Sequence, residues 1–428
     1  MATLYTSRLL LPINRPPIEN GALLVDKGRI LGVGTSERMM AGCPDAHVID
    51  FGNAVLLPPM VNAHTHLELT RFPGWAERAG MAGPPASFVD WIRRLITVKR
   101  GRPTDEFAPS VAAGVSACLA SGTAAIGDVL SYFPARSAYA TAPLRGRIFY
   151  EALGREPAKC RWMLESIAQL VEGGGAGWLS PAVSPHSPYS LSENFLQQVS
   201  SLASRQGLTM MIHLAESPEE VEFLQSSSGP IADQLFPFVD WRGMLPPPAG
   251  ISPLEALERA GGLQPSTVLV HGVQLNDKEI QRIAEVGCSL VLCPRSNARL
   301  EVGQAPLHKL REAGVHLAFG TDSLASVDSL SLWDEIAYAR DSFGADVDPH
   351  FLLETATRGG ARALGVDGEL GTFAPGYGIH FQVVRLPELD GQEQILDYLC
   401  SGVADEAVRL FLDGEEIHAD SWDYLVTE

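Results

Sequence analysis

The stretch AVLLPPMVNAHTHLE at residues 54–68 decides the fold class, because an apolar run ends there in two histidines separated by one residue. Side chains two positions apart in an extended strand project to the same face, so His64 and His66 can bind one metal ion together. An isolated H-x-H is only suggestive, since a hydrogen-bonded structural histidine is the ordinary alternative. The interpretation therefore depends on whether this run is one strand of a larger repeat.

The segments that follow predict such a repeat. Short apolar runs alternate with amphipathic stretches such as NDKEIQRIAEVG and PLHKLREAG, which is typical of βα units and a parallel sheet. Runs that are apolar at successive positions are expected where both faces of the sheet are covered. The predicted strands number eight, as in a (β/α)8 TIM barrel, at 54–62, 123–129, 146–152, 178–186, 208–214, 266–272, 288–294 and 316–322.

The two ends of the chain predict a smaller second unit. The first 55 or so residues contain the β-like runs GALLVDKG, RILGVG and HVIDFG, and similar runs return after about residue 365 in IHFQVV and RLFLDGEEI. We expect an α/β protein with a barrel at 56–365 and a small β-sandwich domain formed by 1–55 together with 366–428. Residues 224–254, after the fifth strand, are rich in proline and aromatic residues, which predicts a lid over the barrel mouth.

Composition and charge restrict the classes of partner. The 428 residues are 46% hydrophobic and 19% charged, as in ordinary globular proteins. The net charge of -19 argues against nucleic acid and anionic membranes as partners, because both would be repelled. No run approaches the ~18 apolar residues of a membrane span, and no basic stretch precedes an apolar core at the N-terminus, so we expect a cytoplasmic protein. The six cysteines include no C-x-x-C pair, which argues against a zinc ribbon.

Further polar residues lie at the ends of other predicted strands. His213 lies near the end of the fifth strand, His271 near the end of the sixth, and Asp322 at the end of the eighth. Barrel enzymes carry their catalytic groups at the C-terminal ends of strands, which meet at one face. Each residue alone has a structural alternative, but four strand ends that all supply ligand-type side chains predict a metal site.

The motifs HTH, HLAE, VHG, CPRSN and GTDS follow one another in this order and resemble the amidohydrolase superfamily, in particular its cytosine deaminase and triazine hydrolase-like branch. The resemblance spans almost the whole chain. It implies that His271 and Glu216 lie beside a bound metal ion. It also implies a set of metal ligands, namely His64, His66, His213 and Asp322.

The resemblance also bears on the number of ions and their identity. Two-metal members of this superfamily usually bridge their ions with a modified lysine on the fourth strand, and this chain has no lysine between Lys159 and Lys278. One divalent ion is therefore expected. Three imidazoles and a carboxylate suit zinc best, although iron and manganese accept similar ligands.

A hydrolytic reaction follows from this set of residues. A divalent ion lowers the pKa of bound water toward ~7 and so supplies hydroxide at neutral pH. Asp322 would take the proton of the water and pass it toward a departing amine, while Glu216 would protonate a ring nitrogen. His271 would orient the water and stabilise developing charge. The alternative for Glu216 is an exposed acid that opens a helix.

Substrate-binding candidates lie at or just beyond the predicted strand ends. Each has an ordinary structural alternative, such as Trp91 in the core or an ion pair between Glu151 and Arg155. Together they describe a cleft with aromatic walls, carboxylates for sugar hydroxyls and arginines for an anionic substituent. A small nucleoside-like substrate is expected. The candidates are Glu68, Trp91, Glu151, Arg155, His186, Arg295 and Asn297.

The stretches HLE, FVDWI, YEALG and CPRSN resemble the aminodeoxyfutalosine deaminases of the alternative menaquinone route, which remove the 6-amino group from an adenine nucleoside with a carboxyphenyl tail. Deamination of S-adenosylhomocysteine, methylthioadenosine or adenosine would use the same chemistry and is a second possibility. The same fold could also carry a triazine-type chlorohydrolase or a non-catalytic scaffold. The family resemblance makes a homodimer plausible.

Overall fold

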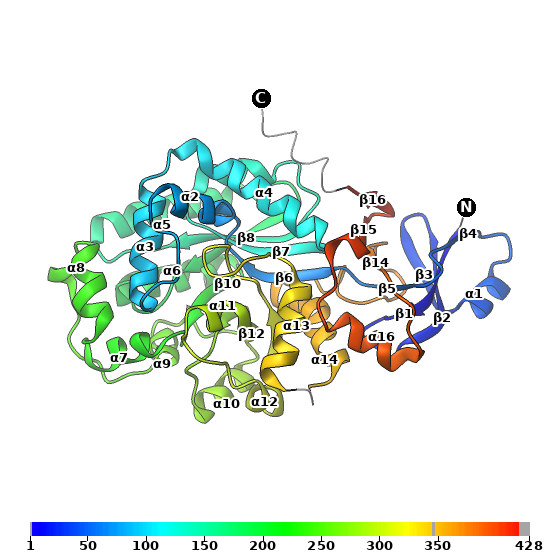
Figure 1. Cartoon of the computed structure of the whole chain (residues 1–428). Coiled ribbons are helices and arrows are strands. Elements are labelled where there is room, and N and C mark those ends of the chain that lie inside the picture. Colours follow the sequence, from blue (N-terminus) through cyan, green and yellow to red (C-terminus); the bar gives the residue numbers. More distant parts are fainter. Residues whose placement is uncertain (1, 345–346, 419–428) are drawn as a thin grey trace.

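The computed structural model describes residues 2–344 and 347–418, and Figure 1 shows a helix-covered barrel beside a smaller sheet. The barrel strands are hydrogen-bonded in chain order, from first to last, and every pair is parallel. The predicted (β/α)8 TIM barrel is therefore confirmed. Its strands are β6 Met60–Thr65, β7 Thr123–Leu130, β8 Arg145–Ala152, β9 Leu179–Pro185, β10 Met210–Leu214, β11 Thr267–His271, β12 Ser289–Leu292 and β13 His316–Phe319.

The barrel closes where the chain leaves β13 and meets β6. Thr65 and Asp322 form a parallel bridge, and the backbone N–H of Asp322 donates to the carbonyl of His64 at 3.1 Å. A Cβ on Gly320 would lie 2.7 Å from the Cβ of His64, so only glycine allows this approach. Closure therefore places Asp322 beside the first histidine pair.

The predicted first strand, 54–62, is wrong in its extent. Residues Ala54–Leu57 form β5, which pairs with the small sheet, and the barrel strand β6 begins only at Met60. Pro58 and Pro59 separate the two strands, because neither proline has an N–H to donate to a sheet. Because the apolar run is unbroken, the sequence did not reveal that the chain passes from the small sheet to the barrel within it.

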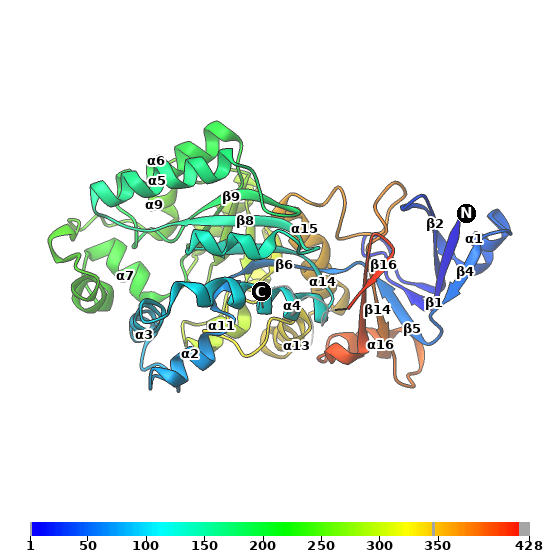
Figure 2. The same ribbon diagram turned by 90° about the horizontal axis from the view of Figure 1, so that it is seen from above.

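Helices follow the strands and cover the outside of the barrel (Figures 1 and 2). The predicted helices in NDKEIQRIAEVG and PLHKLREAG are present as α10 and α12. The outer helices and short helical turns are η1 Leu67–Leu69, α2 Phe72–Arg78, α3 Phe88–Arg100, η2 Thr104–Glu106, α4 Phe107–Ala120, η3 Phe133–Tyr139, α5 Pro157–Glu172, α6 Glu193–Gln206, α10 Asp277–Val286, α11 Pro294–Arg299, α12 Leu307–Glu312, α13 Leu332–Phe343, α14 Pro349–Glu354, η6 Thr355–Gly359 and α15 Gly360–Leu364.

The connection after β10 contains the segment predicted to cover the barrel mouth. It forms α7 Pro218–Ser226, η4 Ile231–Leu235, α8 Phe236–Phe238, η5 Arg242–Met244 and α9 Pro253–Arg259. Buried side chains of this connection, including Phe223 and Phe236, share a hydrophobic cluster with Phe88 and Ile92 of α3. The connection after β10 and helix α3 therefore pack together as one wall.

Both ends of the chain build one mixed sheet that is separate from the barrel. Its order is β16-β15-β14-β5-β1-β2-β3, with β4 also paired to β1. Figure 2 shows β5 and β14 nearer the barrel than β1, β2 and β4. The sheet combines β1 Thr3–Leu10, β2 Ile18–Asp26, β3 Arg29–Thr35, β4 His47–Asp50, β5, β14 Phe381–Arg385, β15 Val408–Leu412 and β16 Glu415–Ile417, with α1 Ser36–Gly42, α16 Gly391–Leu399 and η7 Asp405–Ala407 beside it.

Within the described part of the chain, no helix combines the length and apolar character that crossing a membrane requires. All six cysteines are free thiols, and five of them are buried.

Candidate active site and metal centre

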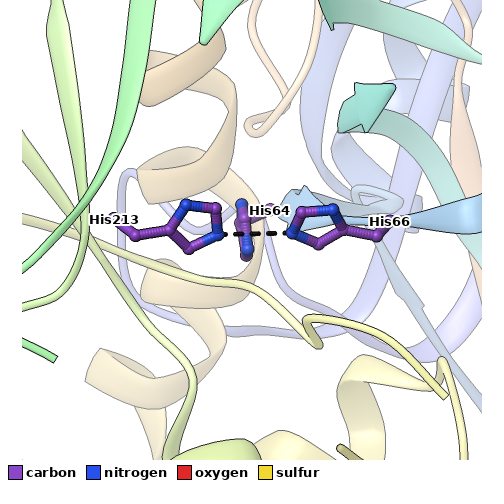
Figure 3. A group of neighbouring side chains, drawn as sticks. All are labelled: His64, His66 and His213. Carbon is purple, nitrogen blue, oxygen red and sulfur yellow. Dashed lines mark hydrogen bonds between the residues drawn. The ribbon is translucent and has the colours of Figure 1, made fainter. Parts of the chain in front are cut away.

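Three histidines meet at the C-terminal end of the barrel. His64 lies within β6, His66 directly follows it, and His213 lies near the end of β10. Figure 3 shows the three rings turned toward one another, with the Nε2 atoms of His66 and His213 only 3.3 Å apart. Their ligand atoms all lie within 4.8 Å of one another. This separation fits a tetrahedral zinc site, in which Zn–N bonds of ~2.0–2.1 Å place two nitrogens about 3.3 Å apart.

The hydrogen bonds of the histidines leave their Nε2 atoms free to bind a metal. His213 Nδ1 donates to the carbonyl of His186 at 2.8 Å. His64 Nδ1 lies 3.2 Å from the thioether of Met211, which can only accept, and His64 Nε2 is buried without a hydrogen-bond partner. Burial lowers the pKa of His64, His66 and His213, so all three imidazoles are neutral. The donor set therefore fits a divalent ion.

Asp322 adds a carboxylate to this group. Its Oδ1 lies 3.8 Å from Nε2 of both His64 and His66, while its Oδ2 accepts hydrogen bonds from Ser296 Oγ at 2.7 Å and Ser326 Oγ at 3.0 Å. The two oxygens thus face different surroundings. The backbone of Asp322 has φ +61°, an uncommon conformation for a residue with a side chain, which costs about 1–3 kcal/mol.

Glu216 and His271 form a second buried pair next to the histidines. Glu216 Oε1 lies 3.6 Å from His271 Nε2, and both residues are almost fully buried. Burial, together with the nearby Asp322 carboxylate, raises the pKa of Glu216 well above its usual range, which favours the protonated carboxyl. Burial lowers the pKa of His271, which is therefore neutral. A carboxyl of raised pKa and a neutral imidazole therefore face each other here.

A cavity of about 620 Å³ opens onto these groups. Its inner end is lined by His66, His213, Glu216, His271 and Asp322. Its outer part is lined mainly by apolar and aromatic side chains from α3, from the start of α5 and from the connection after β10. These outer residues include Trp91, Ile92, Leu95, Ile96, Met163, Leu235, Val239 and Trp241. The cavity therefore joins a polar end to an apolar channel, as small-molecule sites usually do.

Glu68 lines the cavity but its carboxylate is already fully bonded. Lys99 and Ser131 Oγ donate to Oε1, and the backbone N–H groups of Ser131 and Tyr132 donate to Oε2 at 3.2 and 2.8 Å. Burial alone would raise the pKa of Glu68, but the ammonium of Lys99 and these hydrogen bonds hold it below its usual range. The structure places Glu68 as an anchor for Lys99 and for the turn after β7.

Glu151 lies near the end of β8, and its buried carboxyl also lines the cavity. Burial raises its pKa to about 7, against the opposing effect of Lys99. The ion pair with Arg155 that the sequence allowed is absent from the ion pairs of the described residues. Glu151 therefore faces the cavity as an acid that titrates near neutral pH.

Trp91, Arg155 and His186 all line the cavity, and each also bonds to the backbone of the protein. Trp91 lies in helix α3, and its indole donates to the carbonyl of Ala325 at 3.2 Å. The guanidinium of Arg155 donates to the carbonyls of Tyr189 and Leu191. His186 accepts the hydrogen bond of His213 through its backbone carbonyl. Arg155 and His186 thus stabilise the wall of the cavity.

Arg295 and Asn297 do not line this cavity in the described structure. Arg295 points to the other side of α11, where it pairs with Asp328 and lies 3.5 Å from the buried Glu335. Asn297 lies behind His271, with its Oδ1 2.8 Å from His271 Nδ1. The expected contact of these two residues with substrate is therefore not supported, because the helix turns both side chains away from the cavity.

Lys99 and Trp241 are among the contributors to the site that the sequence analysis missed. Lys99 reaches the cavity from the last turn of α3, and Trp241 reaches it from the connection after β10. Neither belongs to a strand end, and no motif marks them. The amphipathic spacing of FVDWIRRLITVK could have indicated that one face of α3 is buried, but not which element would cover it.

Comparison with known proteins agrees with this geometry. Residues 55–408 match the amidohydrolase family. The chain is 32% identical over 326 residues to an aminodeoxyfutalosine deaminase of Deinococcus radiodurans, covering 73% of this chain and 74% of that protein. It is 29% identical over 368 residues to a 5-methylthioadenosine/S-adenosylhomocysteine deaminase of Syntrophobacter fumaroxidans, covering 83% and 78%.

Among solved structures, the aminofutalosine deaminase of Helicobacter pylori superimposes with a TM-score of 0.83 at 23% identity, covering 98% of this chain and all of that one. This structural similarity supports the fold, whereas the family match and the Deinococcus relative show the family to which the chain belongs. The chain belongs to the amidohydrolase family and is a hydrolase that acts on carbon–nitrogen bonds.

Proposed function

We propose that this enzyme hydrolyses the exocyclic amino group of an aminopurine nucleoside and releases ammonia. The observation that carries the proposal is the geometry of the buried Glu216 carboxyl, which lines the cavity beside the His64, His66 and His213 cluster, with Oε1 3.6 Å from His271 Nε2; burial also raises its pKa. A poor leaving group such as an amine benefits from a proton donor at the ring. A site built only to bind a nucleoside would have no use for such a donor.

The residues of this chain would divide the reaction as follows. His64, His66, His213 and Asp322 would hold one divalent ion, with zinc favoured by the imidazole-rich donor set. When bound, the ion supplies a water of lowered pKa as nucleophile. Glu216 donates its proton to a ring nitrogen as the ring carbon becomes tetrahedral, and Asp322 passes a proton from the attacking water to the leaving amine. His271 orients the water through its free Nε2.

The proposed substrate fits the shape and polarity of the cavity. Glu151 is the carboxylate available for sugar hydroxyls, because that of Glu68 is fully bonded. The apolar part of the cavity lining, which includes Trp91 and Trp241, suits a large substituent on the nucleoside. Among the candidate nucleosides, 6-amino-6-deoxyfutalosine is our first choice, supported by the name of the Deinococcus relative and by the room for an aromatic tail.

Ammonia release by zinc-loaded protein tests this proposal. The panel contains 6-amino-6-deoxyfutalosine, S-adenosylhomocysteine, methylthioadenosine, adenosine and a chlorotriazine. We expect deamination of at least one nucleoside and the highest kcat/KM with 6-amino-6-deoxyfutalosine. Chloride release from the triazine without ammonia from any nucleoside would contradict the proposal, as would ammonia release that survives in a Glu216→Gln, Asp322→Asn double variant.

A further inference from the structure

We propose that two adjacent residues of α11, Ser296 and Asn297, are positioning residues that orient the two catalytic groups Asp322 and His271. This inference rests on the proposed function for the roles of Asp322 and His271, but its geometry stands apart from any substrate. Helix α11 follows β12 directly, and both side chains are buried, with exposures of 0% and 2%. Consecutive residues of one helical turn thus reach the ends of two different strands.

The first contact selects the tautomer of His271. The carbonyl oxygen of the Asn297 side chain lies 2.8 Å from His271 Nδ1 and can only accept, so Nδ1 carries the proton of the neutral ring. His271 Nε2 is then left with a lone pair, is buried without a hydrogen-bond partner, and faces Glu216 Oε1 at 3.6 Å. Without Asn297 the ring could turn or exchange its proton, and Nε2 would no longer act as an acceptor.

The second contact selects which oxygen of Asp322 faces the histidines. Ser296 Oγ donates to Oδ2 at 2.7 Å, and Ser326 Oγ donates to the same oxygen at 3.0 Å. Oδ1 is thereby turned toward His64 and His66, whose Nε2 atoms lie 3.8 Å away. Hydroxyl donors on one oxygen make the two ends of the carboxylate inequivalent.

His271 and Asp322 need these side-chain contacts because both have an unfavourable backbone conformation. His271 has φ +74° and Asp322 has φ +61°, in the left-handed region that disfavours side chains. A residue remains in that region only where its surroundings hold it there. The α11 pair supplies a side-chain contact to each, which explains why Ser296 and Asn297 are buried and turned away from the cavity.

Asn297 can be tested with two variants of similar size. Asn297→Asp keeps an acceptor for His271 Nδ1, whereas Asn297→Leu removes it. We expect Asn297→Leu to lower kcat by about 10–100-fold with KM and zinc content unchanged, and Asn297→Asp to retain more activity. A raised KM with unchanged kcat would overturn the inference in favour of substrate contact. An equal loss in both variants would overturn it in favour of a merely structural role.

A double-mutant cycle and a spectroscopic measurement complete the test. In a His271→Ala background, Asn297→Leu should cause no further loss of kcat, because it acts only through that ring. In zinc-loaded protein with labelled histidines, ¹⁵N NMR should show His271 with its proton on Nδ1, and Asn297→Leu should abolish that single tautomer. A tautomer that persists in Asn297→Leu would overturn the inference. This measurement needs no substrate, so it remains decisive even if the proposed deamination fails.

Ser296 is tested through the metal site. Ser296→Ala should weaken zinc binding and lower kcat by about 10-fold. Ser296→Thr keeps the hydroxyl and should retain zinc affinity and kcat close to those of the parent. Zinc affinity and kcat of Ser296→Ala equal to those of the parent would contradict the role assigned to its hydroxyl. Circular dichroism and thermal unfolding of each variant separate these effects from loss of the fold.

Discussion

The inner end and the outer wall of the cavity are built in different ways. At the inner end the reactive groups lie at or just beyond the ends of barrel strands and, apart from the partly exposed His66, are nearly fully buried. The outer wall consists of side chains from α3, α5 and the connection after β10, and one hydrophobic cluster joins α3 to that connection. The difference indicates that reaction chemistry depends on the strand ends and substrate selection on the helices.

The largest expected effect comes from the inner end, at Asp322. Asp322→Asn keeps the shape of the side chain but removes the charge and the proton acceptor. We expect kcat to fall by about 10³-fold or more, because proton transfer from the attacking water is lost. Steady-state ammonia release and metal analysis of the same sample check this. Activity within 10-fold of the parent at full zinc content would show that another group takes the proton.

The next largest effect is expected at Glu216, with a characteristic pH dependence. Because burial raises the pKa of Glu216, its acid form persists to higher pH than that of an ordinary glutamate and is lost as the pH rises further, so kcat should decline on the alkaline side. Glu216→Gln should lower kcat by about 10²–10³-fold and remove that decline. Glu222→Gln, on the exposed face of α7 and away from the cavity, is the matched control and should leave kcat unchanged.

A moderate effect is expected at Glu151, where the inner end meets the outer wall. Its pKa of about 7 means that the carboxylate form dominates above neutral pH, so KM should rise as the pH falls below about 7. Glu151→Gln should raise KM by about 10-fold at pH 8 and make it independent of pH, with little change in kcat. If KM of the variant still followed the parental pH profile, a group other than Glu151 would contact the sugar.

The smallest effect is expected at the outer wall. Trp241→Ala should raise KM by about 5-fold for a nucleoside with an aromatic tail and leave kcat nearly unchanged, because it removes apolar contact area far from the reacting carbon. Trp162→Ala is the matched control, since Trp162 is 62% exposed and does not line the cavity. A loss of kcat in Trp241→Ala with unchanged KM would break the proposed division between the two regions.

The difference between the inner end and the outer wall of the cavity also explains what the sequence could predict. His64, His66, His213, His271 and Asp322 could be placed together because strands in a closed parallel sheet must bring their C-terminal ends to one face. The position of each residue near a predicted strand end was therefore enough to predict that these side chains meet. The barrel itself followed from eight apolar runs that alternate with helical stretches, and only the run through Pro58 and Pro59 concealed a change from one sheet to the other.

The outer wall could not be predicted in this way, because helix rotation decides which side chains reach the cavity. Arg295 and Asn297 follow a strand end just as Glu216 does, yet one turn of α11 directs the first to Glu335 and the second behind His271. Lys99 lies 31 residues from Glu68, and no local pattern links them. Such contacts depend on how helices and strands pack in three dimensions, and no local pattern in a single sequence predicts that packing.

The central claim is that the histidine cluster and Asp322 direct water to the carbon that bears an exocyclic amine. The most direct measurement is deamination of 6-amino-6-deoxyfutalosine in ¹⁸O-labelled water by metal-free and zinc-loaded protein. We expect equal amounts of ammonia and of a product with one ¹⁸O on the purine ring, and only after zinc is added. Equal activity of the thoroughly metal-free protein, or a product without ¹⁸O, would contradict this claim.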